Sequence, residues 1–434
     1  MVGKQKIVLI GAGSLIFGLG SVGNILASEI LKGATICLHD INADTLDLTY
    51  QASRAAIDEK NLDFELISTT DRQEALNNGT FIISSIEVTP RYPLLDMDYR
   101  IPQEFGNKQV SGENGGPGGL FHSLRIIPPV LEICDDIAKI CPNAFIINLS
   151  NPMSRVCLAI MRKYPELKFV GLCHEYHHFL PILEKILGTQ ISNLDIKAGG
   201  FNHFGVFLDI IYKDTNKDAY PDLRKKGPQF LKNFQGYDGF KLIGFILKKY
   251  GYCPYTTDSH YGEYLSFAWE KGDIPAIRHF WASHGRVITS HRLVKLKKFI
   301  EKGKGHKIVK PDDEHAIPII EGILTDANYV EHSVNIPNDG IITNLPQDSV
   351  VECPAIINRN GVNGIKLGEY PKGLAALLRT QYSVQDLVVD AAITKSKDLA
   401  LQALLTDPVV ESYWQAKNIL DHMLKIQADY IRLE

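Results

Sequence analysis

Short apolar runs alternate with amphipathic stretches over residues 1–172. The run Lys6–Ile10 is rich in β-branched residues and ends at a glycine-containing turn. Apolar residues then recur at helical spacing over Phe17–Leu31, and a second apolar run, Thr35–Leu38, ends at His39-Asp40. Two strands joined by a helical crossover of this length form a βαβ unit, which predicts neighbouring parallel strands.

The same alternation continues beyond this unit. Further runs of strand length are Phe64–Ser68, Phe81–Ile86, Ala144–Leu149 and Phe169–Leu172, and Arg125–Ile140 has helical periodicity. The pattern predicts an α/β fold, with a doubly wound parallel sheet in a Rossmann-type nucleotide-binding domain. We place this domain at residues 1–196.

The pattern changes from Lys197 onward. Phe207–Tyr212 has the character of a strand, whereas Gly239–Tyr250 and Val287–Lys302 have helical periodicity. Short strands and turn signals return at residues 330–365, and the stretch 372–434 is helical. We expect a mixed α+β domain over residues 197–434 that binds substrate and forms contacts between subunits. The stretch 300–312, rich in Lys, Gly and Asp, is expected to be a surface loop or a mobile crossing.

Composition narrows the function classes. The formal net charge of −4 gives no indication of a nucleic-acid or acidic-membrane partner. The seven cysteines are an odd number, are widely spaced and include no CxxC motif, which favours a reducing compartment over a disulfide framework. The first apolar run is too short to cross a membrane and is not followed by a signal-cleavage site, so we expect a cytoplasmic protein without a membrane anchor.

The first turn has the features of a dinucleotide site. Gly11, Gly13 and Ser14 lie between a strand and a helix, where small residues let the backbone approach a pyrophosphate. Asp40 ends the second strand, and a carboxylate there accepts hydrogen bonds from a ribose and favours NAD over NADP. The third glycine position of the fingerprint is Ile16, so a tight βα turn without a cofactor is the alternative.

Polar residues follow two of the later predicted strands, and an Asn-His pair lies just beyond. Asn151 follows one strand, Cys173 and His174 follow the next, and His203 comes after Asn202. Because ligands bind at the carboxyl ends of strands in open α/β sheets, Asn151, Cys173 and His174 are expected to face one crevice. Cys and His can hold a divalent cation. A core cysteine and a hydrogen-bonded histidine are the alternative, and we expect His177 and His178 on a helix surface.

Two other segments are candidates for the site. The glycine-dense stretch Gly112–Leu120 leads into the helix that carries Arg125, and it could close over a ligand or form a sharp turn. The stretch Tyr255–Tyr264 contains Asp258, His260 and Glu263, a density of acid–base groups that suggests a catalytic site. A solvated loop with aromatic anchors is the alternative.

The ordered set of motifs resembles glycoside hydrolase family 4 over almost the whole chain. The segments that carry the resemblance are Gly11-Ala12-Gly13-Ser14, Gly116–Arg125, Asn151-Pro152-Met153, Cys173-His174, Asn202-His203, Asn335–Asn338 and Val350–Ala355. This family is an exception to the two-carboxylate mechanism of glycosidases. The resemblance implies that NAD takes and later returns a hydride at C3 of the sugar. It also implies that a divalent metal, usually manganese, stabilises the charge formed when a base removes the C2 proton.

The resemblance also implies roles for individual residues. Cys173 and His203 would be the metal ligands, and Asn151 would contact the sugar hydroxyls. Asp258 would perform acid–base work, with His260 and Glu263 as further candidates, and Arg125 would anchor the substrate or the closing loop. A small sugar is the expected partner, and the family leads us to expect a homodimer or homotetramer.

The residues after Cys173 bear on the sugar. His174 is typical of family members that cleave unphosphorylated α-glycosides, and His174-Glu175 resembles the α-galacturonidase and α-glucuronidase branch. A uronate carboxylate needs a cationic partner, for which Arg91, Arg100 and Arg125 are candidates. An α-galactosidase or α-glucosidase is the alternative within the family. A lactate/malate-type NAD dehydrogenase is the alternative from another class.

Overall fold

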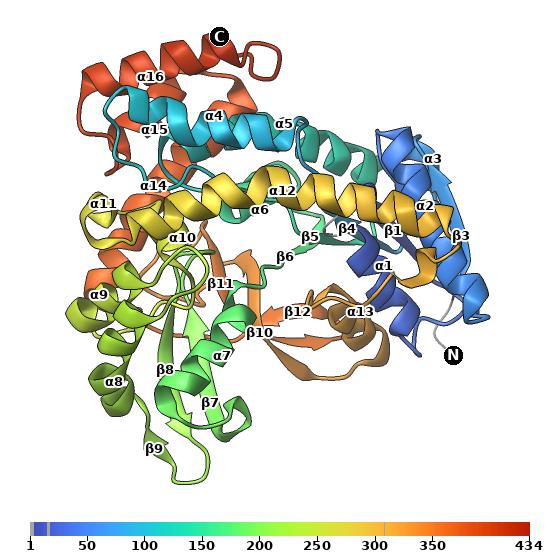
Figure 1. Ribbon diagram of the computed structural model, residues 1–434, viewed down its shortest axis with the longest axis horizontal. Coiled ribbons are helices and arrows are strands. Elements are labelled where there is room, and N and C mark those ends of the chain that lie inside the picture. Colours follow the sequence, from blue (N-terminus) through green and yellow to red (C-terminus); the bar gives the residue numbers. More distant parts are fainter. Residues whose placement is uncertain (1–3, 15–17, 308) are drawn as a thin grey trace.

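A nine-stranded sheet runs through the protein with helices on both faces (Figure 1). The computed structural model describes residues 4–14, 18–307 and 309–434. The strand order is β12-β11-β10-β6-β5-β4-β1-β2-β3. Strands β1 (Lys6–Ile10), β2 (Thr35–His39), β3 (Glu65–Thr69), β4 (Phe81–Ser84), β5 (Phe145–Asn148) and β6 (Lys168–Gly171) pair in parallel. The predicted doubly wound parallel sheet is confirmed.

Strand β1 shows why these runs form a buried sheet. Its alternate residues enter two different hydrophobic cores: Ile7 and Leu9 pack on one face, and Val8 and Ile10 pack on the other. Parallel strands covered on both faces need continuous apolar runs, which is the pattern of the sequence here. The helices of this half are α1 (Gly18–Ala27), α2 (Ala43–Glu59), α3 (Arg72–Leu76), α4 (Arg91–Glu104), α5 (Gly116–Ile140), α6 (Met153–Lys163) and α7 (Glu175–Leu187).

Three strands from the second half of the chain complete the sheet. They are β10 (Tyr329–Pro337), β11 (Val350–Asn358) and β12 (Gly361–Gly364), and all pair antiparallel. Asn335 of β10 pairs with Gly171 of β6, which joins the two halves. The return of short strands near 330–365 is as predicted from sequence, but their addition to the first sheet was not foreseen.

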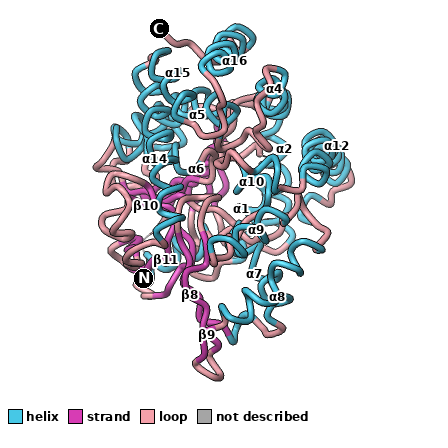
Figure 2. Tube along the Cα trace, turned by 90° about the vertical axis from the view of Figure 1, so that its left-hand side faces the viewer, coloured by secondary structure: helices cyan, strands magenta, loops and turns pink. Residues whose placement is uncertain are grey.

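The rest of the second half is a small antiparallel sheet surrounded by helices. Its strands are β7 (Leu194–Gly199), β8 (Val206–Tyr212) and β9 (Lys217–Asp218), and the β8–β9 hairpin extends from one end of the molecule (Figure 2). The helices are α8 (Tyr220–Asn233), α9 (Lys241–Tyr250), α10 (Asp258–Gly262), α11 (Ala268–Lys271), α12 (Ile274–Glu301), α13 (Ala316–Thr325), α14 (Lys372–Thr394), α15 (Lys397–Thr406) and α16 (Tyr413–Ile426), with short 3₁₀ turns at Ile191–Asn193 and Gly305–Lys307. None of the described helices is long and apolar enough to cross a membrane.

The segment before α13 packs tightly against α1. A Cβ atom on Gly20 would lie 1.7 Å from a carboxylate oxygen of Asp312, and one on Gly23 would lie 2.2 Å from the carbonyl carbon of Lys310. Asn24 donates a hydrogen bond to Asp312 over 2.6 Å. Glycines on α1 therefore let this segment approach the helix closely, so at Lys310 and Asp312 it is held against α1.

Candidate active site

Cys173 and His203 are brought together by two different loops. Cys173 follows β6, and His203 lies in the turn between β7 and β8, where its backbone adopts a positive φ of 59°. The Sγ atom of Cys173 lies 3.3 Å from Nε2 of His203. Burial, together with the nearby His260 and His174, holds the pKa of His203 well below its usual value, so its imidazole is neutral. A neutral imidazole nitrogen beside a sulfur is a donor pair suited to a divalent cation.

The thiol of Cys173 is protonated in the absence of a cation. Burial raises its pKa well above the usual value, and the negative charges of Glu352 and Glu175 add to this effect. A bound cation reverses this balance because metal coordination stabilises the thiolate. Metal binding at Cys173 would therefore release a proton.

A shell of amides surrounds the Cys173–His203 pair. The Asn114 side chain lies 3.1 Å from Nδ1 of His203, and its Oδ1 atom is buried without a partner among the described residues. Rotating this amide would place Oδ1 as the acceptor for an Nδ1–H, which leaves Nε2 free for a metal. On the other side, Asn202 and Asn335 donate to the buried carboxylate of Glu352 over 2.9 and 3.0 Å.

His260 packs against His203 and is surrounded by carboxylates. The two imidazoles meet edge to face with centroids 4.5 Å apart. Nδ1 of His260 lies 3.6 Å from Asp238, and Nε2 lies 3.8 Å from Glu113. Burial lowers the pKa of His260, but Glu175, Asp238 and Glu113 outweigh it and raise the pKa to about 10. His260 is therefore a protonated donor at neutral pH.

Asp258 is buried and faces the backbone instead of the Cys173–His203 pair. Its carboxylate accepts hydrogen bonds from the N–H groups of Ile243, over 3.1 Å, and Asp273, over 2.8 Å. The bond from Ile243 satisfies an N–H group in the first turn of α9, which has no partner within the helix. This is the role of a helix-capping carboxylate. Burial raises its pKa to about 7. The high density of acid–base groups in this stretch therefore combines one residue near the pair, His260, with one that supports the fold.

Glu263 holds the glycine-dense loop in place. Its carboxylate accepts from the N–H groups of Glu113, Asn114 and Gly115 over 3.2, 2.6 and 2.6 Å. The first turn of α5 begins within this stretch, at Gly116, earlier than the helical periodicity predicted. A Cβ atom on Gly119 would lie 2.5 Å from the carbonyl carbon of Asn114, so the loop folds directly onto the helix. Glu263 thereby positions Asn114 beside His203.

Arg125 lies away from this group of side chains. Its Nη1 atom donates to Asp98 over 3.0 Å and to Gln427 over 2.6 Å, and its Nη2 atom pairs with Asp98 as well. The arginine and the aspartate are both buried. Arg125 therefore ties α5 to α4 and to the C-terminal residues and is not in contact with Cys173 or His203.

His174 directly follows Cys173, and Asn151 lies in the turn between β5 and α6. Nδ1 of His174 lies 3.0 Å from Glu314, and its ring is 4.3 Å from that of His178. The Oδ1 atom of Asn151 is buried without a hydrogen-bond partner among the described residues. An unpaired acceptor in this turn is available to a ligand hydroxyl.

The turn after β1 is tightly folded at its glycines. Gly11 has a positive φ of 85°, and a Cβ atom there would lie 2.6 Å from the carbonyl oxygen of Ser85. The N–H of Gly13 donates to Asp40 over 2.8 Å, which fixes the carboxylate at the end of β2, and Ser14 closes the turn by donating to the Gly11 carbonyl over 3.0 Å.

Ile16 and Phe17 lie outside the described residues. The fingerprint has no glycine at its third position, but Gly18 allows α1 to pack closely on the turn. A Cβ atom added to Gly18 would lie 2.2 Å from the carbonyl oxygen of Ala12.

Four residues near the pair were not selected from sequence. Glu113 and Asn114 were noticed only as part of a glycine-dense loop, and Glu175 only as part of a subfamily motif. Asp238 precedes Gly239, which has a positive φ of 101°, and no motif marks it. The glycine pattern alone could have indicated that the first two lie near a ligand.

Comparisons with known proteins identify the family. The model described as "Family 4 glycosyl hydrolase" matches residues 6–189, and that of the "Family 4 glycosyl hydrolase C-terminal domain" matches residues 198–410. The chain is 42% identical to an α-glucosidase of Erwinia rhapontici, over 98% of both chains. It is 29% identical to an α-galactosidase of Bacillus subtilis, over 98% of this chain and 99% of that one.

A solved structure has the same fold. A 6-phospho-α-glucosidase from gut microorganisms, in complex with NAD and Mn²⁺, superposes with a TM-score of 0.85 at 22% identity, covering 99% of this chain and 100% of that one. The family models cover both halves of the chain and favour glycosidase chemistry over the dehydrogenase alternative. The chain therefore belongs to family 4 of the glycosyl hydrolases.

Proposed function

We propose that the protein hydrolyses an uncharged, unphosphorylated α-glycoside with the help of NAD and a divalent metal, for which manganese is the first candidate. The observation that carries this proposal is the 3.3 Å separation between Cys173 Sγ and His203 Nε2 at the end of β6. This donor pair lies beyond the parallel sheet whose first turn carries Gly11 and Gly13, the residues predicted to bind the dinucleotide. The relative with 42% identity is an α-glucosidase, which makes α-glucosides the first substrates to test.

The described residues fit both cofactors. Gly11, Gly13 and Ser14 would hold the pyrophosphate at the start of α1, and Asp40 would accept from the ribose. Cys173 and His203 would hold the metal, with Asn114 orienting the imidazole. When bound, NAD supplies a reversible hydride acceptor and the metal supplies Lewis-acid polarisation of the sugar oxygens.

The side chains around this pair supply binding and proton transfer. We assign proton donation to the departing glycosidic oxygen to His260, because its imidazolium is stabilised by Asp238 and Glu113. Asn151 offers its unpaired amide oxygen to a sugar hydroxyl. His174, held by Glu314, would contact the substrate beside Cys173. In this scheme Asp258 and Glu263 act indirectly, through the backbone that they position.

The pairing of arginines supports an uncharged sugar. Arg91 lies 3.3 Å from Glu113, Arg100 lies 2.6 Å from Asp96, and Arg125 is paired with Asp98. Each arginine considered as a partner for a uronate is thus already neutralised by a carboxylate. α-Galactosides are the second candidates, because one relative has that activity, and α-uronides are the third.

A substrate panel tests the proposal. We would assay p-nitrophenyl α-glucoside, α-galactoside, α-glucuronide and α-galacturonide with NAD, Mn²⁺ and a thiol reductant, and repeat each assay with one component omitted. Cleavage of a neutral glycoside that requires both NAD and Mn²⁺, without net NADH, is expected. Cleavage without NAD, or NADH accumulation without cleavage, would refute the mechanism. A uronide cleaved faster than both neutral sugars would refute only the substrate class.

A further inference from the structure

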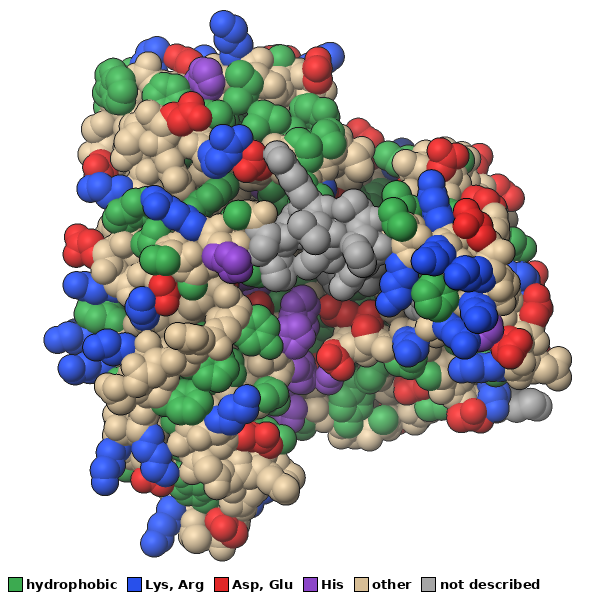
Figure 3. All heavy atoms as spheres, viewed as in Figure 1, with side chains coloured by type: hydrophobic (Ala, Val, Ile, Leu, Met, Phe, Trp, Pro, Cys, Tyr) green, Lys and Arg blue, Asp and Glu red, His purple; other side chains and the backbone are tan. Residues whose placement is uncertain are grey.

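A cavity of about 800 Å³ opens beside the start of α7, on the face where histidines and carboxylates gather (Figure 3). Its walls come from α1, α7 and residues 312–321. The carboxylates that line it are Glu184, Asp312, Asp313, Glu314 and Glu321. No Lys or Arg is among the described residues that line this cavity, so its charge favours a cation.

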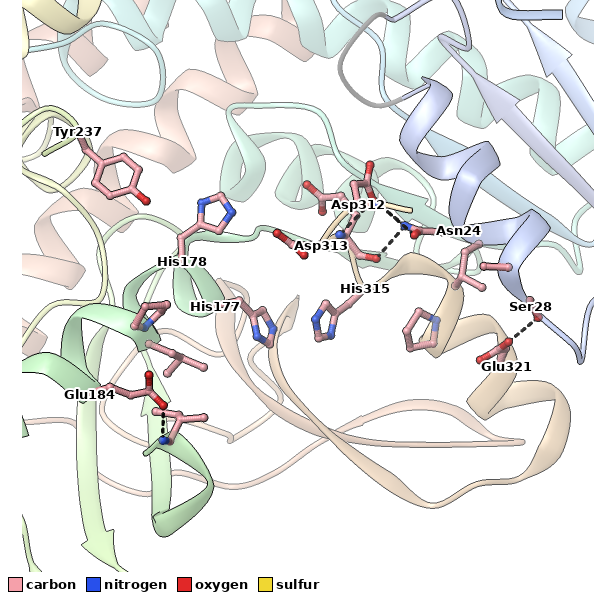
Figure 4. A pocket seen from close by; sticks show the side chains of 17 residues that line it. Asn24, Ser28, His177, His178, Glu184, Tyr237, Asp312, Asp313, His315 and Glu321 are labelled. Atoms are coloured by element: carbon pink, nitrogen blue, oxygen red, sulfur yellow. Dashed lines mark hydrogen bonds between the residues drawn. The ribbon is translucent and has the colours of Figure 1, made fainter. Parts of the chain in front are cut away.

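His177 and His315 lie face to face on the cavity wall, with ring centroids 3.9 Å apart and planes 24° from parallel (Figure 4). Behind them lies the carboxylate of Glu331, which is only 2% exposed. Nδ1 of His315 is 2.8 Å from one oxygen of Glu331, and Nε2 of His177 is 3.4 Å from the other. Three ligand-type groups from α7, β10 and the turn before α13 therefore lie close together, with one ligand atom of each within 4.8 Å of the others.

The arrangement leaves one nitrogen poorly satisfied. Nε2 of His177 is buried, and its 3.4 Å contact with Glu331 does not meet the geometry of a hydrogen bond. The second acceptor site of the carboxylate is shared with the backbone N–H of His332, 3.0 Å away. Buried polar atoms in proteins nearly always have a partner, so this nitrogen calls for an additional group between itself and Glu331.

The distances suit a small divalent ion. Ligand atoms around a tetrahedral zinc ion, each about 2.0–2.2 Å from the metal, lie roughly 3.4 Å from one another. The separation between His177 Nε2 and one oxygen of Glu331 already has this value. One ligand atom from each of the three residues lies within 4.8 Å of the others, so closing them around one ion takes shifts of about 1.4 Å at most. A proton that His315 now shares with Glu331 would be released on binding.

We propose that His177, His315 and Glu331 form a second divalent-metal site, of the zinc type, with a fourth position open to water in the cavity. Two imidazoles and one carboxylate are a common zinc donor set. The site contains no sulfur and shares no residue with the Cys173–His203 pair, so it does not depend on the proposed function. Its metal would fasten α7 to β10 and to the turn before α13.

This location gives the site an influence on the catalytic loop. His315 directly follows Glu314, which lies 3.0 Å from His174 beside Cys173. A metal on His315 would limit movement of the backbone that carries Glu314. It would thereby hold His174 in place from a site that does not touch the sugar.

Cobalt(II) substitution tests the proposal, because cobalt reports its ligands by absorption. The parent protein would be the double variant Cys173→Ser, His203→Gln, which lacks the sulfur site, with its fold checked by circular dichroism. After removal of metals with a chelator, Co²⁺ is titrated alone. We expect one equivalent to bind with intense tetrahedral d–d bands and no sulfur-to-metal charge-transfer band.

Two further substitutions identify the ligands. His315→Gln keeps a hydrogen-bond donor near Glu331 but removes the imidazole ligand, and His177→Gln does the same on α7. Each is expected to weaken Co²⁺ binding to the parent at least tenfold, whereas the control His178→Gln, on the same helix and cavity wall, leaves it unchanged. The proposal is wrong if the parent binds no Co²⁺, or if neither ligand substitution weakens binding.

The wild-type chain provides a second measurement if the parent does not fold. In that chain the two sites separate by spectrum, since only Cys173 contributes a sulfur band. A second equivalent of Co²⁺ that intensifies the d–d bands without the sulfur band supports the proposal. A single equivalent that always carries the sulfur band overturns it.

Discussion

The Sγ atom of Cys173 lies 3.3 Å from Nε2 of His203, although the two residues are 30 positions apart in the chain. Zinc-type ions sit about 2.3 Å from sulfur and about 2.0–2.1 Å from nitrogen, so one ion can contact both atoms with little rearrangement. The sheet and the β7–β8 turn therefore preorganise a donor pair that no local motif encodes.

Removing either member of this pair is expected to abolish most activity. Cys173→Ser and His203→Gln should each lower the rate of hydrolysis by about 100-fold or more, since a Lewis acid supplies several kcal/mol of charge stabilisation. Initial rates across a Mn²⁺ titration at saturating NAD would measure this. Cys141→Ser, another buried cysteine located where α5 ends, is the control and should retain full activity. Wild-type rates for both ligand variants at low Mn²⁺ would contradict the assignment.

Asn114 is expected to tune the metal affinity through His203. Asn114→Ala removes the side chain 3.1 Å from Nδ1 of His203, and losses of such indirect partners typically weaken metal binding about 10–100-fold. Calorimetric titration with Mn²⁺ would show this change, while the NAD affinity of the same variant serves as the internal control and should not move. An unchanged Mn²⁺ affinity would mean that Asn114 does not orient the ligand.

Asp258 is expected to act on stability more than on turnover. Its folded-state pKa is raised to about 7, above an unfolded value of about 4. The stability that its proton uptake contributes is therefore complete below about pH 4 and is lost as pH rises through about 7. Asp258→Asn cannot titrate, so the Tm of the wild type should fall relative to that of the variant between pH 5 and pH 8.

Thermal unfolding of both proteins at four pH values, with kcat measured in parallel, checks this prediction. Parallel Tm curves would show that the carboxyl does not titrate in this range. If Asp258→Asn instead lowers kcat by more than about 100-fold at unchanged Tm, Asp258 acts as an acid–base group.

Asp40 is expected to select NAD over NADP. Asp40→Asn keeps an acceptor for the Gly13 N–H, which now donates to Asp40 over 2.8 Å, but removes the negative charge. The Kd for NAD should rise about tenfold, because a hydrogen bond to a charged group typically contributes about this much to affinity. The ratio of the Kd for NADP to the Kd for NAD should fall. Fluorescence titration with both dinucleotides measures the ratio. If the ratio of the two Kd values stays constant, Asp40 does not face the ribose.

The sequence predicted the parallel sheet well because its signal is local. Runs such as Lys6–Ile10 and Thr35–Leu38 are apolar on both faces, and glycine and polar residues mark where they end. The addition of β10 to β6 could not be predicted in this way. That pairing depends on Asn335 meeting Gly171, a long-range contact that no periodicity encodes.

The site was predictable only in part for the same reason. Cys173, His203 and His260 could be selected from sequence because their residue types suit metal binding and proton transfer, and the structure brings them together. Asp258 has an equally suggestive type, but its role depends on the position of α9, whose N–H groups it faces. His177 was expected on a helix surface, and its contact with Glu331, which comes from a distant strand, has no local sequence signal.

The late arrival of β10 has a consequence for the synthesis of the protein. On the ribosome, β6 emerges with one edge unpaired, and its partner strand follows only after residues 172–328 have been made. At translation rates of about 5–20 residues per second this takes roughly 8–30 s. Exposed strand edges recruit other chains, so a nascent or truncated chain ending before residue 329 would expose a surface prone to aggregation and to chaperone capture.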